Sequence, residues 1–580
     1  MIKTLAKSVR EYKKQAILTP VLVSFEVIIE CLIPFITTFF IEEIESAAPR
    51  LKVIVGWGVL LVVLAALSLT FGALAGRTCA VASCGFAKNL RHDLYYSVQD
   101  FSFANIDKFS SSSLVTRMTT DVSNVQMAFM MIIRTAVRAP FMIIFSFVMV
   151  IVTSPKMSVG FAVIVPILAI GLLAIMLSAH PIFKSVFKKY DNLNSSVQEN
   201  VHGMRVVKSF VREDYERKKF AKASEEVAND FKKAEKIIAL NTPLMQLCFN
   251  LLMLFACYFG TRLIITTNES ALKGAELSAI ITYGAQILMS LMMLSMIIVM
   301  LVLSAASAAR IAEVLNEKST IINPENPVTE VADGRVEFKN VVFSYSEKAE
   351  KPSLSDINLS IGAGETVGII GGTGSGKTSL VQLISRLYDV SEGSVTVGGV
   401  DVRDYDLETL RTQVATVLQK NVLFSGTIKD NIRWGDPDAS DEEIERICAL
   451  AAADEFIKTF PDGYDTYIEQ GGTNVSGGQK QRLCIARALI RKPKVLILDD
   501  STSAVDTRTD ALIRRAFAEE IPGTTKIIIA QRISSVEHAD KIVVLDGGRI
   551  ESIGTHEELL ERSPIYREVY NSQVKGDEDK

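Results

Sequence analysis

The arrangement of apolar and polar residues divides the chain into two parts. Within the first 310 positions, six apolar runs each approach or exceed the roughly 20 residues that a helix needs to cross a bilayer. These runs lie near 16–41, 53–76, 129–153, 157–180, 243–267 and 276–305. The pattern therefore predicts an all-α membrane domain with six spanning helices.

Basic residues beside these runs predict how the helices are oriented. The first run is too long for a signal-peptide core, and it follows Lys3, Lys7, Arg10, Lys13 and Lys14. Because Lys and Arg collect on the cytoplasmic side of membranes, the N-terminus is predicted to be cytoplasmic. Alternation then places two long basic segments, after the second and fourth runs, on the same side. Their helix-like patterns continue those of the apolar runs, so we expect the helices to project into the cytoplasm.

After the sixth run the pattern becomes that of a water-soluble α/β domain. The polar stretch Asn316–Gly334 contains Pro324 and Pro327, which is typical of a linker. Beyond it, helical stretches alternate with β runs at Val336–Tyr345, Thr366–Ile370, Val495–Leu498, Ile527–Ala530 and Ile542–Leu545. The predicted divisions are a membrane domain over 1–315, a linker over 316–333, an α/β domain over 334–572 and a frayed tail over 573–580.

Composition agrees with a protein that lies partly in membrane and partly in water. Of 580 residues, 48% are hydrophobic, which is high for a soluble enzyme, while 22% are charged. The near balance of 62 basic against 66 acidic residues gives no basic excess for nucleic-acid binding. Seven Cys without a CxxC pair exclude a disulfide framework and argue against a structural zinc site.

A glycine-rich segment carries the strongest chemical signal. It follows the predicted strand Thr366–Ile370, precedes a helical run at Ser379–Leu387, and consists of Gly371, Gly372, Thr373, Gly374, Ser375, Gly376, Lys377 and Thr378. This is the strand–loop–helix context of a P-loop, in which backbone N–H groups surround phosphates. Lys377 would add a charge at the β/γ-phosphates, and the Thr378 hydroxyl could ligate Mg²⁺.

Two further segments fit this site. The buried-strand run Val495–Leu498 ends in Asp499, which is placed to hold Mg²⁺ through water. A loop upstream of it contains Ser476, Gly477, Gly478 and Gln479. By itself such a loop is equally typical of a helix cap, but it gains meaning beside the two phosphate-site elements.

Taken together, these motifs resemble the ATP-binding cassette (ABC) family, with Val475–Gln479 as its signature loop. Six spans fused to one P-loop α/β cassette resemble a half-transporter of the exporter type. The resemblance implies ATP and Mg²⁺ as cofactors, with Tyr345 stacking on adenine and Gln419 sensing Mg²⁺ and the membrane domain. The predicted metal residues are Thr378, Gln419 and Asp499. The resemblance also identifies Ser503–Asp506 as the D-loop, so that Asp506 joins the nucleotide residues.

The resemblance also implies a partner. Phe103–Val115 and Gly203–Phe210 resemble the coupling helices of such exporters, although the second also fits an ordinary amphipathic helix. In this family two cassettes face each other head to tail, and each ATP lies between one P-loop and the other signature loop. One chain therefore cannot complete a site.

Two catalytic positions depart from the family pattern. Asp500 stands where the family has a Glu general base, and Gln531 stands where it has a switch His. The Asp carboxylate falls roughly 1 Å or more short of the attacking water, a displacement that can cost ~10²-fold, and Gln cannot carry the proton. Asp could still act as a slow base. The intact signature with a damaged site resembles one half of heterodimeric bacterial exporters, whose partner is a different chain holding the Glu and the His.

Two acidic residues stand out within the first apolar run. Glu26 and Glu30 lie one helical turn apart, and a carboxylate at the bilayer centre costs about 2.5–3.5 kcal/mol. They are candidates for binding a cationic amphiphilic substrate or protons. The alternative is pairing with Arg134, Arg138, Gln246 or Gln286. The Met-rich stretch Met289–Met300 could be an adaptable substrate surface, but such a stretch more often serves for packing.

The sequence thus favours a multi-pass subunit of a bacterial plasma-membrane exporter with both termini and the cassette in the cytoplasm. Its expected partners are membrane lipid, a second half-transporter and a small amphiphilic substrate such as a drug, lipid or peptide, with no nucleic acid. Two other hypotheses stay open: an ATP-regulated gating subunit that does not pump, and an exporter-like importer.

Overall fold

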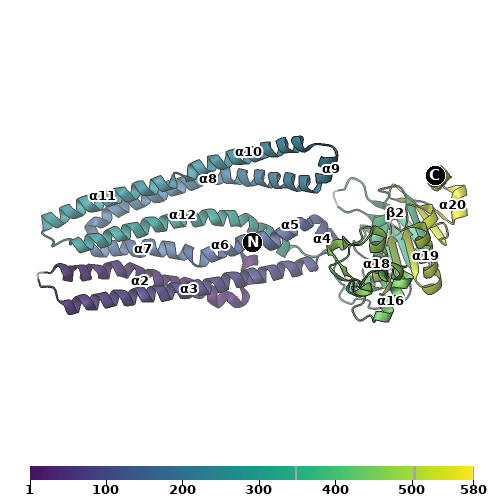
Figure 1. Cartoon of the computed structure of the whole chain (residues 1–580), viewed down its shortest axis with the longest axis horizontal. Coiled ribbons are helices and arrows are strands. Elements are labelled where there is room, and N and C mark those ends of the chain that lie inside the picture. Colours follow the sequence, from purple (N-terminus) through teal and green to yellow (C-terminus); the bar gives the residue numbers. More distant parts are fainter. Residues whose placement is uncertain (47, 347–348, 501–504, 579–580) are drawn as a thin grey trace. The chain divides into compact units, whose positions relative to one another are not determined.

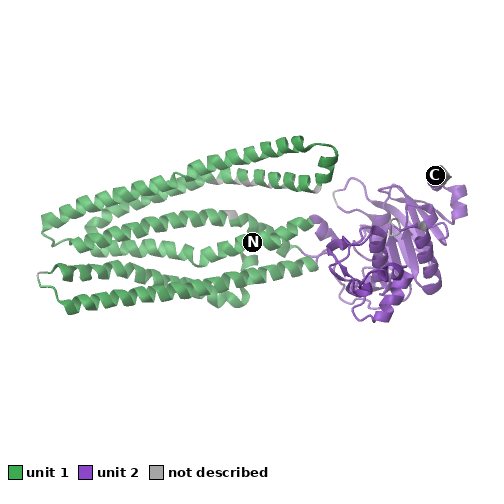
Figure 2. Ribbon diagram, in the orientation of Figure 1, with its two compact units in different colours: residues 1–99, 110–317 green, residues 100–109, 318–580 purple. Residues whose placement is uncertain are grey.

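The computed structural model describes all residues except 47, 347–348, 501–504 and 579–580. It contains two compact units (Figure 2). Unit 1 comprises residues 1–99 and 110–317, and unit 2 comprises residues 100–109 and 318–580. Unit 2 therefore includes ten residues of the first predicted cytoplasmic segment, which the sequence placed in the membrane domain.

Unit 1 is helical throughout (Figure 1). Its elements are α1 (Ile2–Ala6), η1 (Lys7–Tyr12), α2 (Lys13–Glu45), α3 (Leu51–Gln99), α5 (Ser111–Thr116), η2 (Arg117–Asp121), α6 (Val122–Ile133), α7 (Thr135–Thr153), α8 (Pro155–His202), α9 (Met204–Ser209), α10 (Glu213–Ile238), α11 (Asn241–Thr267) and α12 (Gly274–Asn316). Within it α2 packs along α3, α8 along α10, and α7 along α12.

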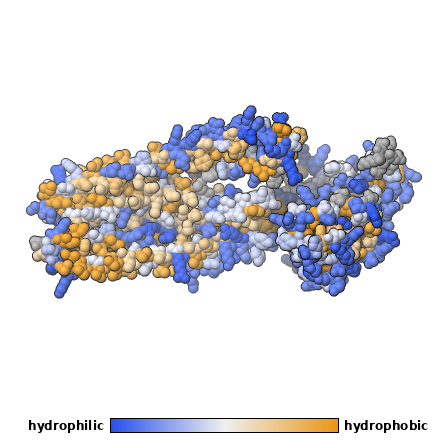
Figure 3. Space-filling model, in the orientation of Figure 1, coloured by the Kyte–Doolittle hydropathy of each residue, from blue (hydrophilic) through white to orange (hydrophobic). Residues whose placement is uncertain are grey.

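Six helical segments of the described chain are long and apolar enough to cross a membrane, which confirms the predicted six-helix domain. The 49 residues of α3 correspond to about 70 Å at 1.5 Å per residue, more than twice the ~30 Å hydrocarbon thickness. Apolar side chains lie on the surface over one end of α2, α3 and α11 (Figure 3). Leu51, Val62 and Leu69 of α3 are 74%, 69% and 73% exposed, as expected of side chains that face lipid.

Unit 2 is an α/β unit with three sheets (Figure 1). The six-stranded sheet has the order β12-β11-β3-β10-β9-β6, the four-stranded sheet β2-β1-β4-β5, and the smallest β7-β8. The strands are β1 (Val336–Phe343), β2 (Leu354–Ile361), β3 (Thr366–Gly371), β4 (Glu392–Val397), β5 (Val400–Asp401), β6 (Val414–Val417), β7 (Gly426–Thr427), β8 (Tyr467–Ile468), β9 (Val495–Asp499), β10 (Thr525–Ile529), β11 (Lys541–Asp546) and β12 (Arg549–Gly554).

The helices of unit 2 surround these sheets. They are α4 (Phe103–Lys108), α13 (Lys377–Ile384), α14 (Leu407–Gln413), α15 (Ile428–Arg433), α16 (Asp441–Leu450), α17 (Asp454–Ile457), η3 (Gly463–Asp465), η4 (Gln470–Gly472), α18 (Gly477–Leu489), α19 (Thr507–Glu520), η5 (Ile533–Ser535), α20 (His556–Arg562) and α21 (Pro564–Glu578). Helix α21 extends past residue 573 to Glu578.

The six-stranded sheet determines where the candidate site lies. Strands β6, β9, β10, β3 and β11 run parallel, and every residue of β9 and β10 is buried because apolar cores cover both faces. Ile529 pairs with Asp499 on one side and with Ile369 on the other. The carboxyl ends of these strands therefore meet at one edge, which is where ligands bind in open parallel sheets.

Candidate functional site

The glycine-rich loop connects β3 to α13 and forms a tight turn. Gly374 and Gly376 have φ values of +80° and +98°, a region that favours glycine. A β-carbon on Gly371 would lie 2.2 Å from the carbonyl oxygen of Leu545, so only glycine fits there. Thr373 and Ser375 complete the turn. The Lys377 ammonium lies inside it and donates to the carbonyl oxygens of Gly371 and Gly372 at 2.8 Å each.

A hydroxyl and a carboxylate lie side by side behind the loop. The Thr378 hydroxyl donates to Asp499 Oδ1 at 3.2 Å, and Asp499 is 3% exposed. Burial raises the pKa of Asp499 and lowers the pKa of Lys377, so both groups gain from a ligand of opposite charge. Hydroxyl and carboxylate oxygens are hard donors that suit Mg²⁺. These residues fit the magnesium ion that the sequence implies.

The two atypical residues contact each other. Asp500 Oδ2 accepts a hydrogen bond from Gln531 Nε2 at 2.8 Å and a longer one from Gln419 Nε2 at 3.4 Å. Gln481 Nε2 donates to the Asp500 carbonyl oxygen at 3.3 Å. Asp500 has a φ of +49°, a region that Asp tolerates better than most residues. The structure thus brings Asp500, Gln419 and Gln531 together as one group, which we call the Asp500 clamp.

Tyr345 lies beside the helix that follows the loop. Its hydroxyl group contacts Ser379 Oγ at 2.8 Å and donates to Gln382 Oε1 at 3.2 Å, so the ring is tied to α13. The ring meets Tyr388 edge to face, with 5.1 Å between centroids, and the residue remains 50% exposed. A fixed and half-exposed aromatic ring can stack on a purine.

The signature loop forms the N-terminus of α18. Ser476 caps this helix: its hydroxyl oxygen accepts from Gln479 N at 3.3 Å, and Gln479 Oε1 accepts from Ser476 N at 2.9 Å. The first turn of the helix, which includes Gly477 and Gly478, presents N–H groups that favour an anion. Among the described residues, no hydrogen bond or ion pair joins Ser476–Gln479 to the loop Gly371–Thr378.

The predicted D-loop is only partly described, since Ser503 and Ala504 lie outside the described residues. Asp506 caps α19 by accepting from Thr509 N at 2.9 Å. This backbone hydrogen bond lowers the pKa of Asp506.

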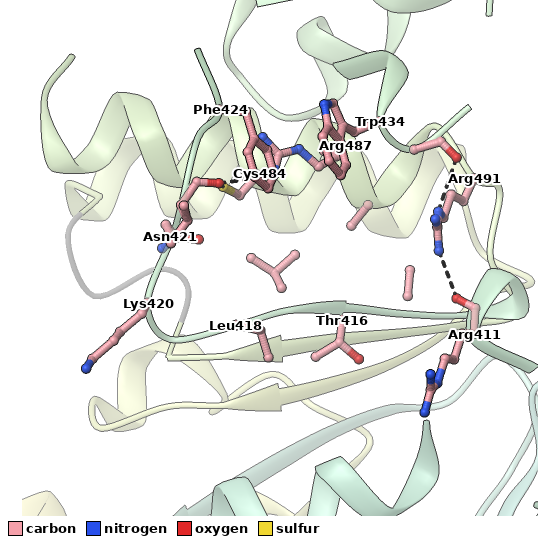
Figure 4. Close-up of a pocket in the computed structure, with 15 residues that line it drawn as sticks. Arg411, Thr416, Leu418, Lys420, Asn421, Phe424, Trp434, Cys484, Arg487 and Arg491 are labelled. Atoms are coloured by element: carbon pink, nitrogen blue, oxygen red, sulfur yellow. Dashed lines mark hydrogen bonds between the residues drawn. The ribbon is translucent and has the colours of Figure 1, made fainter. Parts of the chain in front are cut away.

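A groove of about 320 Å³ lies between β6 and α18 (Figure 4). Its floor includes Ala415 and Val417, and its wall includes stacked rings of Phe424 and Trp434, whose centroids are 4.1 Å apart. Arg487 Nε donates to the Asn431 carbonyl oxygen at 2.9 Å and holds one side. Leu418 and Lys420, the two sequence neighbours of Gln419, both line the groove. The groove was not predicted, because its walls come from segments far apart in sequence.

The first part of one predicted coupling segment, Phe103–Val115, packs inside unit 2 as far as Phe109, and the rest belongs to unit 1. Tyr388 donates to Asp107 Oδ2 of α4 at 2.5 Å, and its ring meets the ring of Phe103 edge to face at 6.1 Å. Burial, together with the Asp107 carboxylate, raises the pKa of Tyr388. Since Tyr388 also contacts Tyr345, α4 and the candidate purine-stacking ring share one neighbour. The second coupling segment forms α9 in unit 1, followed by Phe210, which is 73% exposed.

Both acidic residues of α2 contact a single arginine of α7. Arg138 Nη1 pairs with Glu26 Oε1 at 2.5 Å, and Arg138 Nη2 pairs with Glu30 Oε2 at 2.7 Å. Glu26 is 7% exposed, and its Oε2 has no hydrogen-bond partner among the described residues. These contacts support the pairing alternative, with Arg138 as the partner among the four that the sequence offered.

We expect Arg138→Met to destabilise the membrane unit strongly, because it leaves two carboxylates in an apolar bundle without a counter-charge. Loss of one member of a buried ion pair costs about 3–5 kcal/mol, which should appear as a lower melting temperature in detergent. Arg50→Met is the matched control, since Arg50 pairs with Glu43 at an exposed position. Equal melting temperatures for the two variants would show that the pairing carries no stability.

Comparison with known proteins agrees with this geometry. Residues 17–292 match the ABC transporter transmembrane region family, and residues 354–503 match the ABC transporter family. The chain is 37% identical over 517 residues to the uncharacterized ABC transporter ATP-binding protein YfiB of Bacillus subtilis, covering 89% of each chain. It is also 37% identical over 494 residues to an uncharacterized ABC transporter ATP-binding protein of Mycobacterium tuberculosis, covering 84% of each.

A solved structure shows the same fold. The structure of a bacterial Atm1-family ABC exporter with ATP bound superposes with a TM-score of 0.83 at 24% identity, covering 97% of this chain and 98% of the other. Six spanning helices, a P-loop cassette at the carboxyl edge of a parallel sheet, and relatives across nearly the whole length agree: the chain belongs to the ABC transporter family.

Proposed function

We propose that this chain is the degenerate-site subunit of a heterodimeric exporter. The observation that carries the proposal is the Asp500 clamp, in which the residue at the general-base position accepts hydrogen bonds from two amide groups. A general base needs a lone pair directed at the attacking water and a route for the proton that it removes. Gln531 occupies one carboxylate oxygen and, being neutral, supplies no such route. The cassette's own site would therefore hold ATP and hydrolyse it slowly.

The signature loop of the chain would act on the ATP of the partner. Ser476 and the N-terminal turn of α18 retain the capping geometry that aims N–H groups outward, so they can contact a γ-phosphate held by another P-loop. We propose a different half-transporter as this partner, with a Glu and a His at the two positions where this chain has Asp500 and Gln531. Hydrolysis would then occur at the partner's P-loop.

Mg²⁺, when bound, would neutralise phosphate charge at Thr378 and Asp499, with Gln419 nearby to report its presence. Gln419 lies between Leu418 and Lys420, which both line the groove between β6 and α18. We propose that this groove receives a coupling helix of the partner. Movement of that helix would then be transmitted to Gln419 and to the Asp500 clamp.

The substrate would be a small amphiphilic compound carried across a bacterial plasma membrane, with both termini in the cytoplasm. The lipid-facing surface of α3 and the six spans support a site within the membrane. ATP-dependent flux of amphiphilic dyes into inside-out vesicles that contain both subunits tests the direction. Flux that depends on ATP supports a pump, whereas ATP binding without flux would leave only a gating role.

The chain purified alone is expected to hydrolyse ATP about 10²-fold more slowly than the two-subunit complex, because the Asp500 clamp withholds the base. Steady-state phosphate release measures the rate, and binding of a fluorescent ATP analogue to the same sample serves as the control for a folded site. Turnover of the single chain equal to that of the complex would contradict the proposal.

A further inference from the structure

A second cavity of unit 2, of about 340 Å³, lies at the edge of the sheet opposite the nucleotide residues. Thr366 and Lys526, the first residue of β3 and the second of β10, pair in register there. At the other ends of these strands, Gly371 is the last residue of β3 and Gln531 follows β10. Helix α19 supplies most of the other walls, and Ile528 of β10, Ser535 of η5, His538 and Ala539 complete them. None of the described nucleotide residues lines this cavity.

One wall holds a buried lysine without a partner. Lys526 is 4% exposed, and its ammonium group makes no hydrogen bond or ion pair with any residue that the structure describes. Burial lowers its pKa. Asp540 is the carboxylate that acts on it electrostatically, but Asp540 Oδ2 accepts from Thr366 N at 2.8 Å. The Lys526 ammonium is not enclosed, and it remains available to an anion that enters the cavity.

A lysine at the start of another strand of this sheet has polar partners. Lys541 begins β11, and its ammonium group donates to the Ser360 carbonyl oxygen at 2.9 Å and pairs with Glu365 at 2.7 Å. A lysine near the start of a strand in this sheet can therefore find hydrogen-bond partners. The position of Lys526 in its strand does not explain why its ammonium group has none among the described residues.

A second donor points to the same conclusion from α19. Arg514 lines the cavity, and its Nε is buried without an acceptor in the described part of the chain. Its other nitrogens are engaged, because Nη1 donates to the Ser534 carbonyl oxygen at 2.8 Å and Nη2 pairs with Asp510 at 3.2 Å. The Lys526 ammonium and the Arg514 Nε–H, from separate elements, thus both line the cavity without an acceptor in the described part of the chain.

The rest of the lining is mostly apolar, with Phe517, Ala518, Ile528 and Ala539. We propose that this cavity binds a small organic carboxylate with a compact apolar body, whose charge is held by Lys526 and Arg514. The carboxylate would accept from both donors, and the body would displace water from the apolar wall. An inorganic anion would satisfy the donors but leave that wall in contact with water.

The location gives such a ligand access to the catalytic elements. Helix α19 begins directly after its capping D-loop residue Asp506, and η5 begins two residues after Gln531. The Arg514–Ser534 contact and the hydrogen bond from Ser535 Oγ to Asp510 at 3.4 Å join these two elements. A bound carboxylate would stabilise this junction, so the cavity is placed to regulate the cassette whichever subunit hydrolyses ATP.

Titration of 4-fluorobenzoate into the full chain in detergent, followed by ¹⁹F NMR, tests the proposal. Wild type and the matched control Lys541→Met should bind the probe equally, and Lys526→Met should bind it about tenfold or more weakly, as loss of one charge-assisted hydrogen bond predicts. Ala518→Leu, which fills the cavity and leaves both donors, should also weaken binding. Melting temperatures of all variants confirm folding.

Two further probes separate the parts of the proposal. The neutral isostere 4-fluorobenzamide should bind more weakly than the carboxylate, and inorganic phosphate should compete poorly with it. The proposal is overturned if Lys526→Met binds 4-fluorobenzoate as well as wild type does, if the amide binds as tightly as the carboxylate, or if phosphate competes at equal concentration.

Discussion

Changing Ser476→Ala together with Gly477→Asp is expected to abolish nearly all ATP hydrolysis by the complete transporter, whereas Lys377→Ala is expected to leave measurable turnover. The first change removes a hydroxyl group at the start of α18 and places a carboxylate where the partner's γ-phosphate would lie. Like charges at a partly desolvated interface repel strongly, and loss of one transition-state donor alone costs ~10²–10³-fold. Lys377 contacts the P-loop of this chain, so its loss should mainly lower ATP retention there.

The measurement combines ATPase rate with trapped nucleotide in the two-subunit complex. Ser440→Ala is the matched control. The Ser440 hydroxyl caps α16 by accepting from Glu443 N, as Ser476 caps α18, and Ser440 has no predicted contact with nucleotide. It removes a cap worth about 1 kcal/mol and should leave hydrolysis intact. If Lys377→Ala stops turnover while the signature variant remains active, hydrolysis occurs on this chain's own P-loop and the proposed roles are reversed.

Asp500→Glu combined with Gln531→His is expected to raise turnover of the complex and shorten nucleotide retention at this chain's site. The longer Glu side chain recovers the ~1 Å that Asp lacks, which is worth up to ~10²-fold at that site, and His restores a group that can carry a proton. Because Asp500 and Gln531 are in contact at 2.8 Å, we expect the single changes not to add up to the effect of the double change.

Phosphate release and nucleotide occupancy of the single and double variants in the partnered complex measure this coupling. Asp500→Asn with Gln531→His is the control, since Asn keeps the size of Asp but cannot act as a base. It should stay at the low rate. Unchanged turnover and occupancy in the Glu and His double variant would remove the main support for a degenerate site.

The sequence by itself determined the features that depend on local patterns. Hydrophobic length determined the six spans, because a helix that crosses a bilayer must be apolar over about 20 residues. The P-loop was predictable because its glycines are needed at adjacent positions of one turn. The parallel strands β3, β9 and β10 were predictable because both faces are buried, so each contains a short apolar run.

The strands of the antiparallel sheet were harder to predict. The sequence located β1 but not β2, β4 or β5, since β2 alternates buried and exposed residues over a short stretch and β5 has only two residues. Such short alternation is weak against the background of loops, and the pairing that stabilises it involves residues elsewhere in the chain.

Only the tertiary structure decided which distant residues meet. Asp500 and Gln419 are 81 residues apart, and Tyr388 and Asp107 are 281 apart. The sequence named four possible partners for Glu26 and Glu30, and helix packing selected Arg138, which is 112 residues from Glu26. Lys526 drew no attention as one lysine in an apolar strand, because its missing acceptor is a property of the walls around it. Side-chain contacts between segments depend on how sheets and helices pack, and a local pattern does not contain that information.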